Sequence, residues 1–153
     1  MKYLLLALPT LLIYTGISKL NALKAFIETL NVVLNKIHNI KVNLLKNKAT
    51  FLADITIVNP NKSQFNLETI GLVKLKRVLF YEPNGVLIGS GVVNISAINI
   101  EAGEDFVLKN IPFSTSLTTG FAKLKTFLQK PETTKVLIEL EFEAFNKTYK
   151  TQL

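Results

Sequence analysis

Hydrophobic residues follow two different periods along this chain. After a nearly continuous apolar run over residues 3–18, they recur every three or four positions up to about residue 39, as on one face of a helix. From residue 40 they recur at every second position, as in strands with one buried face. Turn residues interrupt the second part at intervals of about 8–12 positions, which is typical of an antiparallel sandwich or barrel. We therefore predict a hydrophobic segment over residues 1–18, an amphipathic helix over 19–39 and a mainly β domain over 40–153.

The first segment carries no charge between Tyr3 and Ser18, and Lys2 and Lys19 flank it. As a helix it is roughly 24 Å long, somewhat shorter than the ~30 Å hydrocarbon core of a bilayer, and flanking lysines extend to the headgroups. The residues expected to contact a membrane are Leu4, Leu5, Leu6, Leu8, Leu11, Leu12, Ile13, Lys19 and Lys24. A cleaved secretory signal is the main alternative, because Gly16-Ile17-Ser18 fits a small-x-small cleavage site.

The predicted helix over 19–39 has an apolar stripe and an opposite side rich in asparagine and lysine. The stripe consists of Leu20, Leu23, Ile27, Leu30, Leu34 and Ile37, at spacings of three and four. Such a helix packs against a β-domain or a copy of itself, or it lies in the membrane interface with its lysines toward lipid phosphates. The pattern leaves both interpretations open.

Strand and turn signals alternate through the β part of the chain. A strand with Phe51, Ala53, Ile55 and Ile57 on one face runs into Asn59-Pro60-Asn61, where Pro60 lacks a backbone donor and asparagine favours a turn. Further turns are predicted at Pro83-Asn84-Gly85 and at Glu101-Ala102-Gly103-Glu104. A short helix is predicted to close one end or edge of the sandwich, with one apolar face formed by Phe121, Leu124, Phe127 and Leu128.

The order of these motifs resembles the late-embryogenesis-abundant type 2 family, also called the WHy domain. The resemblance covers roughly residues 40–150, and it rests on the Asn-Pro-Asn strand end, Phe65 and Leu67, Asn84-Gly85 with Ile88-Gly89-Ser90-Gly91, and Ile100–Glu104. It implies a fibronectin-III/immunoglobulin-like sandwich without catalytic residues, linked to stress protection and to membranes, and many plant members carry an N-terminal membrane segment. The fold-motif residues are Asn59, Pro60, Asn61, Gly85, Gly89, Gly91 and Gly103.

Charge is concentrated in the N-terminal part of the chain. The formal net charge is +7, and seven lysines fall within residues 1–48 against a single acidic residue, Glu28. Nucleic acid and anionic lipid both attract such a segment, and its apolar run favours lipid. Nucleic acid is not expected to bind the sandwich, which has one arginine, Arg77, and no basic stripe with interleaved aromatic residues.

The sequence contains few residues suited to catalysis or metal binding. It has no cysteine and one histidine, His38, which excludes thiolate and multi-histidine sites. We interpret Glu139, Glu141 and Glu143 as a solvated strand face with lysine partners, and the run Lys74, Lys76 and Arg77 as a solvated strand edge. Gly85, Gly89 and Gly91 are not followed by the Gly-Lys-Ser/Thr of a phosphate loop, so we interpret them as turn and bulge glycines. We expect no catalytic residue, cofactor, metal or small-molecule substrate.

The sequence favours a non-enzymatic, membrane-anchored β-sandwich that serves as a structural or interaction module and binds lipid and other protein subunits. We predict a single-pass membrane protein with an N-terminal anchor. The lysines on both sides of the span leave its orientation nearly undetermined, with a weak preference for a cytoplasmic domain. The first alternative is a minor structural subunit of a large assembly, such as a membrane-containing virion. The second is an exported stress-protective domain with a cleaved signal peptide.

Overall fold

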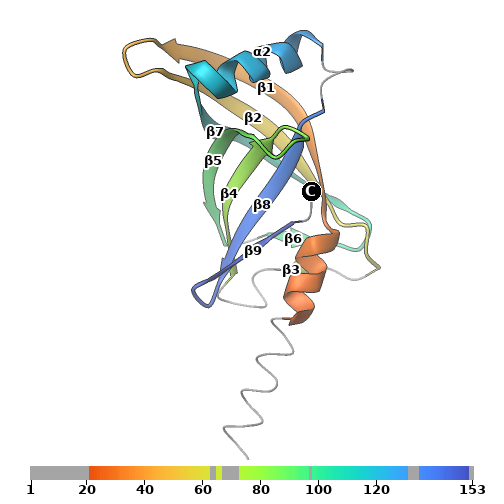
Figure 1. The fold of residues 1–153 in the computed structure, drawn as a ribbon. Helices are drawn as coiled ribbons and strands as arrows, with labels where there is room; N and C mark the ends of the chain where they lie inside the picture. Colours follow the sequence, from red (N-terminus) through yellow and green to blue (C-terminus); the bar gives the residue numbers. More distant parts are fainter. Residues whose placement is uncertain (1–20, 63–64, 67–72, 97, 131–134, 152–153) are drawn as a thin grey trace, which may run out of the picture.

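A computed structural model describes residues 21–62, 65–66, 73–96, 98–130 and 135–151 (Figure 1). The described chain opens with a helix over residues 21–29. The elements that follow are β1 (Asn31–Asn43), β2 (Lys48–Val58), β3 (Phe65–Asn66), β4 (Val73–Tyr81), β5 (Leu87–Ile95), β6 (Asn99–Ile100), β7 (Asp105–Ser116), the π-helix η2 (Leu117–Phe121), α2 (Ala122–Gln129), β8 (Leu137–Ala144) and β9 (Lys147–Lys150). The predicted mainly β, antiparallel fold is confirmed in these residues.

One curled sheet organises the described residues. Seven strands follow one another in the order β1-β2-β7-β5-β4-β8-β9, and all of their pairings are antiparallel. The sheet bends until β1 contacts β8, although β8 lies several strands away in the sheet order (Figure 1). The inner faces of the strands therefore enclose a single core, while β3 and β6 form a separate small pair.

The core is built on the alternating residues that the sequence indicated. Phe51, Ala53, Ile55 and Ile57 of β2 are all at most 1% exposed. The ring of Phe113 stacks between Phe51 and Phe80, with centroid separations of 5.2 and 4.4 Å. Stacked aromatic rings contribute beyond the area that they bury, so this trio fixes the packing between β2, β7 and β4.

Gly89 and Gly91 lie at the junction between the two halves of the sheet. The strands β5 and β7 are paired through Ser90 with Ser114 and Gly91 with Phe113. A β-carbon at Gly91 would lie 3.0 Å from Phe113 and from the carbonyl oxygen of Pro112, which is tighter than an ordinary contact, so the close approach of these strands favours glycine. Gly89 adjoins a bulge as predicted, because the pairing of β4 with β5 skips Ile88. Gly91 is not in a bulge, and that part of the prediction is wrong.

The predicted amphipathic helix over 19–39 is too long. In the structure the helix ends at residue 29, and residues 31–43 form β1, which pairs with β2 along its length. The sheet therefore begins nine residues before the predicted domain start at residue 40, at Asn31. Leu23, Ile27 and Leu30 of the predicted stripe are buried in the same core as the strands.

Asn59 is a buried clamp between two loops, and its role exceeds that of a turn residue. The strand β2 ends at Val58 as predicted, and Asn59 has no exposed surface. Its side-chain Nδ2 donates to the carbonyl oxygens of Ile100 and Glu101 at 3.3 and 3.2 Å, and its backbone N–H donates to the carbonyl of Glu104. The N–H of Gly103, where φ is +73°, donates back to the Asn59 carbonyl. Asn-Pro-Asn and the Glu101–Glu104 turn are thus one structural unit.

The predicted short helix is present and is preceded by a π-helical turn. In η2 and α2, Leu124 is buried and Leu128 is exposed, so the predicted apolar face is only partly covered. The η2 turn contacts β2, β5 and β7, and it closes the end of the sheet where β1 meets β2. Gly120 packs so tightly against Thr115 and the carbonyl of Ile88 that a β-carbon has no room. Pro131, which cannot continue a helix, and Gly71 both fall outside the described residues.

Candidate functional site

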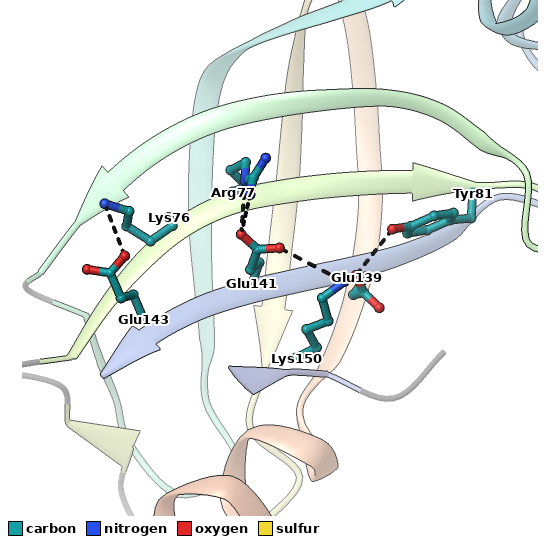
Figure 2. Close-up of polar contacts among 7 residues, drawn as sticks. All are labelled: Lys76, Arg77, Tyr81, Glu139, Glu141, Glu143 and Lys150. Atoms are coloured by element: carbon teal, nitrogen blue, oxygen red, sulfur yellow. Dashed lines mark hydrogen bonds and ion pairs between the residues drawn. The ribbon is translucent and has the colours of Figure 1, made fainter. Parts of the chain in front are cut away.

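Charged side chains converge on the outer face of β4, β8 and β9 (Figure 2). Leu140 and Phe142 of β8 point into the core, so the residues between and beside them, Glu139, Glu141 and Glu143, share the opposite face. The register places Arg77 opposite Glu141 on one side, and Lys150 opposite Glu141 on the other. Three carboxylates thereby meet cations supplied by both neighbouring strands.

Each carboxylate has a cationic partner. Arg77 donates from Nε and Nη2 to Oε1 of Glu141 at 2.9 and 2.8 Å, and the Nζ of Lys150 donates to Oε1 of Glu139 at 2.7 Å. Lys76 lies 3.5 Å from Oε2 of Glu143, in the more exposed part of the face. Glu139 and Glu141 are each only 9% exposed, which differs from the solvated face that the sequence indicated. The expected basic partners are confirmed for this face.

Two proton-binding groups in this cluster are perturbed by their surroundings. Burial raises the pKa of Tyr81, and the charge of Glu139, whose Oε1 accepts from the Tyr81 hydroxyl at 3.4 Å, raises it further. The hydrogen bond to Glu139 raises the pKa of Lys150, against a smaller opposing effect of desolvation. At neutral pH Tyr81 therefore keeps its hydroxyl proton and Lys150 keeps its positive charge. Both side chains continue to donate hydrogen bonds to Glu139. The cluster's three cations balance its three carboxylates.

The cluster is suited to holding strands together rather than to binding a cation. Among the described residues, no group of three or more histidine, aspartate or glutamate side chains is placed to hold a metal ion. The strand β4 is an interior strand, between β5 and β8, so the predicted strand edge at Lys74, Lys76 and Arg77 is wrong. The structure instead assigns Lys76 and Arg77 to the paired cluster.

His38 lies on β1 and not at the end of a helix. Its Nε2 is 3.5 Å from Oδ1 of Asp54 on β2. That carboxylate also accepts the N–H of Asn110 at 2.7 Å, and this hydrogen bond lowers the pKa of Asp54. Asp54 falls where the pairing of β2 with β7 shifts register, so this contact stabilises a bulge.

Of the predicted membrane-contacting residues, only Lys24 lies in the described part of the chain. Leu4, Leu5, Leu6, Leu8, Leu11, Leu12, Ile13 and Lys19 fall outside it. The Lys24 side chain is exposed and lies 3.7 Å from Glu28, one turn along the helix. Within the described residues, no helix has the length and hydrophobicity needed to cross a bilayer.

Leu44 and Leu45 are the most exposed apolar residues of the described chain, and neither is among the site residues predicted from the sequence. The alternation that begins at residue 40 predicts a strand through Leu44, whereas both leucines lie in the turn between β1 and β2. They are 81% and 100% exposed. The sequence does contain a signal for this turn, because Asn43 and Asn47 lie on either side of the leucines and asparagine favours turns.

The described residues define a mainly β protein with a seven-stranded antiparallel sheet. No protein-family model matches the chain, and no curated protein does so. Among solved structures, the chain is similar to a protein from Archaeoglobus fulgidus, at 16% identity and a TM-score of 0.35, over 77% of this chain and 89% of that one.

Two further structures have comparable similarity. One is the Northeast Structural Genomics Consortium target SoR45, at 10% identity and a TM-score of 0.35, with 82% of this chain and 83% of that chain covered. The other is an uncharacterized β-sandwich protein from Clostridium difficile, at 12% identity and a TM-score of 0.29, with 81% and 85% covered. At these TM-scores the similarity assigns no function to the chain.

Proposed function

We propose that this chain is a non-enzymatic, membrane-anchored β-sandwich module. Residues 1–18 are the anchor, and the β domain is held next to the membrane, where it binds another protein or the lipid surface. The proposed class is a fibronectin-III/immunoglobulin-like sandwich of the late-embryogenesis-abundant type 2 kind. The ordered turn motifs support this class, as does the joining of Asn59 to the Glu101–Glu104 loop by hydrogen bonds.

The observation that carries the proposal is the helix over residues 21–29. It follows the uncharged segment directly, and its apolar residues Leu23 and Ile27, with Leu30 just beyond its end, are at most 4% exposed in the core of the β domain. This face is occupied by protein, which favours the interpretation that the helix packs on the domain over the interpretation that it lies in lipid. In the sequence, only residues 19 and 20 separate the predicted anchor from this helix.

The closed cluster on β4, β8 and β9 supports a role without catalysis. Catalytic carboxylates need an environment that leaves them available to a substrate, and Glu139 and Glu141 are instead buried against Lys150 and Arg77.

The proposal is tested by substituting one residue of the predicted anchor. Leu12→Lys places a charge in the middle of the apolar segment, which costs about 2.5–3.5 kcal/mol at the centre of a membrane helix. We expect this variant to lose flotation with neutral liposomes. Val107→Lys, on the exposed surface of β7, is the matched control and should float like the unmodified chain. Undiminished flotation of Leu12→Lys would overturn the anchor, and sedimentation of the native protein as a large particle would favour the assembly subunit.

A further inference from the structure

The turn between β1 and β2 displays two leucines to solvent among lysines. Leu44 and Leu45 are 81% and 100% exposed, and Val42 beside them is 48% exposed. Lys41, Lys46 and Lys48 flank the same turn and are also exposed. Scattered single apolar residues on a surface need no explanation, but two adjacent leucines at the tip of a hairpin are a contiguous apolar feature.

Hydrogen bonds hold this hairpin tip, residues 41–48, in a fixed conformation. The N–H of Lys46 donates to Oδ1 of Asn43 at 3.0 Å, and the N–H of Asn47 donates to the carbonyl of Leu44 at 3.1 Å. Asn47 has a φ of +47° and its carbonyl accepts the N–H of Leu117, which ties the tip to η2. The leucines therefore do not fold back onto the domain, and their exposure is built into the turn.

A basic, hydroxyl-lined pocket adjoins the hairpin tip. It has a volume of about 370 Å³, and its polar lining includes Lys46, Lys48, Ser90, Ser114, Ser116 and Thr119. None of the described residues that line it is acidic. The neighbouring carboxylate on the β4–β5 connection, Glu82, is paired with Lys123 of α2 at 2.9 Å. The pocket thus presents uncompensated positive charge and hydroxyl groups beside the two leucines.

We propose that the hairpin tip binds an anionic lipid surface, with Leu44 and Leu45 in the apolar layer and Lys46 and Lys48 at the phosphates. Apolar side chains flanked by lysines suit the boundary between acyl chains and headgroups. Protein interfaces are instead enriched in arginine and aromatic residues and depleted in lysine, and the tip contains neither arginine nor an aromatic residue. Single-stranded nucleic acid is bound on aromatic stacking platforms, which the tip also lacks.

The position of the tip makes this a second lipid contact, separate from the proposed anchor. The tip and the helix over residues 21–29 lie at opposite ends of the described structure, joined by β1 (Figure 1). At about 3.3 Å per residue, β1 separates them by roughly 40 Å. The proposed lipid contact of the hairpin tip follows from the exposed leucines and lysines and does not depend on the proposed anchor. If both contacts exist, the chain connects two membrane surfaces.

The experiment uses tryptophan as a reporter, because the chain contains none. Leu45→Trp replaces a fully exposed residue, and Phe145→Trp, in the exposed turn between β8 and β9 at the other end of the sheet, is the matched control. The full chain is first mixed with neutral phosphatidylcholine vesicles, and flotation shows whether the anchor holds it there. Vesicles with 30% phosphatidylserine are then added, a composition about as anionic as a PS-rich membrane, and tryptophan emission is recorded. If the chain does not float with the neutral vesicles, it is mixed with the anionic vesicles directly. Binding of the hairpin tip is then measured whether or not residues 1–18 act as an anchor, so the two proposals can fail separately.

We expect the anionic vesicles to shift the emission of the Leu45→Trp variant to the blue and to leave that of the Phe145→Trp variant unchanged. In the Leu45→Trp background, Lys46→Gln with Lys48→Gln should weaken binding about 30-fold, at roughly fivefold for each lysine near a lipid surface. Lys74→Gln with Lys147→Gln makes the same charge change at the other end and should leave binding unchanged.

Three results would each overturn the proposal. The first is an unshifted emission of the Leu45→Trp variant with anionic vesicles, and the second is an equal shift with neutral vesicles. The third is a shift that grows with protein concentration in the absence of lipid, which would favour a second copy of the chain as the occupant of the tip.

Discussion

Asn59→Ala is the substitution that most directly tests how the loops of this domain are held. The Asn59 side chain donates to the carbonyls of Ile100 and Glu101, and its Oδ1 accepts the backbone N–H and side-chain Nδ2 of Asn61 at 3.1 Å. A hydrogen bond contributes about 0.5–1.5 kcal/mol net, and a buried group left without its partner costs about 1–3 kcal/mol. Because Asn59 is fully buried, the substitution leaves the carbonyls of Ile100 and Glu101 without this partner away from bulk solvent. We expect the free energy of unfolding to fall by about 2–4 kcal/mol.

Urea unfolding followed by circular dichroism measures this change from the transition midpoint. Asn61→Ala is the matched control, because it keeps its backbone N–H and loses only side-chain contacts with Thr29 and Asn59 in a more exposed position. It should cost less than about 1 kcal/mol. If Asn59→Ala changes stability by less than about 0.5 kcal/mol, as surface substitutions do, the clamp between the two loops is refuted.

Three further predictions concern the charged cluster, the π-helical turn and the aromatic core. The pKa values of Tyr81 and Lys150 are raised in the folded state, so the stabilisation that they provide is complete below the ordinary values of 10.0 and 10.5 and is lost as the pH rises through the folded values. Absorbance titration near 295 nm should therefore show a late step whose amplitude Tyr81→Phe lowers by one tyrosine, and a late step that Tyr81→Phe leaves unchanged would contradict the assignment. Gly120→Ala should lower stability by about 1–3 kcal/mol through overpacking against Thr115, whereas a thermal midpoint equal to that of the unmodified chain would show that this contact is loose. Phe113→Ala should cost about 3–5 kcal/mol and exposed Phe145→Ala almost nothing, so similar unfolding midpoints for the two would exclude the aromatic stack as a centre of stability.

Much of the sheet follows from local sequence rules. The alternation around Phe51 and around Phe142 predicts β2 and β8, because a half-buried strand repeats every two residues. The turns at Gly85 and Gly103 can be predicted from the glycines themselves. Both positions have a positive φ in the structure, which glycine adopts without strain. These features depend on neighbours in the chain, so they are visible without the fold.

The first strand was missed because its irregularities imitate a helical period. The pairing of β1 with β2 shifts register between Leu34 and Lys36 and again between His38 and Lys41. A bulge adds a residue to the alternation, which changes the spacing of the partly buried residues Leu34 and Ile37 from two to three. The valine and isoleucine content of this segment favours a strand, whereas the spacing of its apolar residues favours a helix.

The charged cluster and the hairpin tip depend on contacts between distant residues. The sequence shows that Glu139 and Glu141 share a face, but their burial arises because Arg77 of β4 and Lys150 of β9 flank them. The exposure of Leu44 and Leu45 likewise requires the register that places Asn43 opposite Lys48. Pairings of this kind are set by the sheet topology and cannot be predicted from the local spacing of hydrophobic residues.

We propose above all that residues 1–18 anchor the β domain in a membrane. The most direct measurement is flotation with native membranes of the full chain and of a variant lacking residues 1–18, each with and without alkaline carbonate. The deletion must end before residue 21, because the helix over 21–29 and β1 belong to the core. We predict that the full chain floats and resists carbonate and that the shortened chain loses this resistance, whereas release of the full chain by carbonate would contradict the claim.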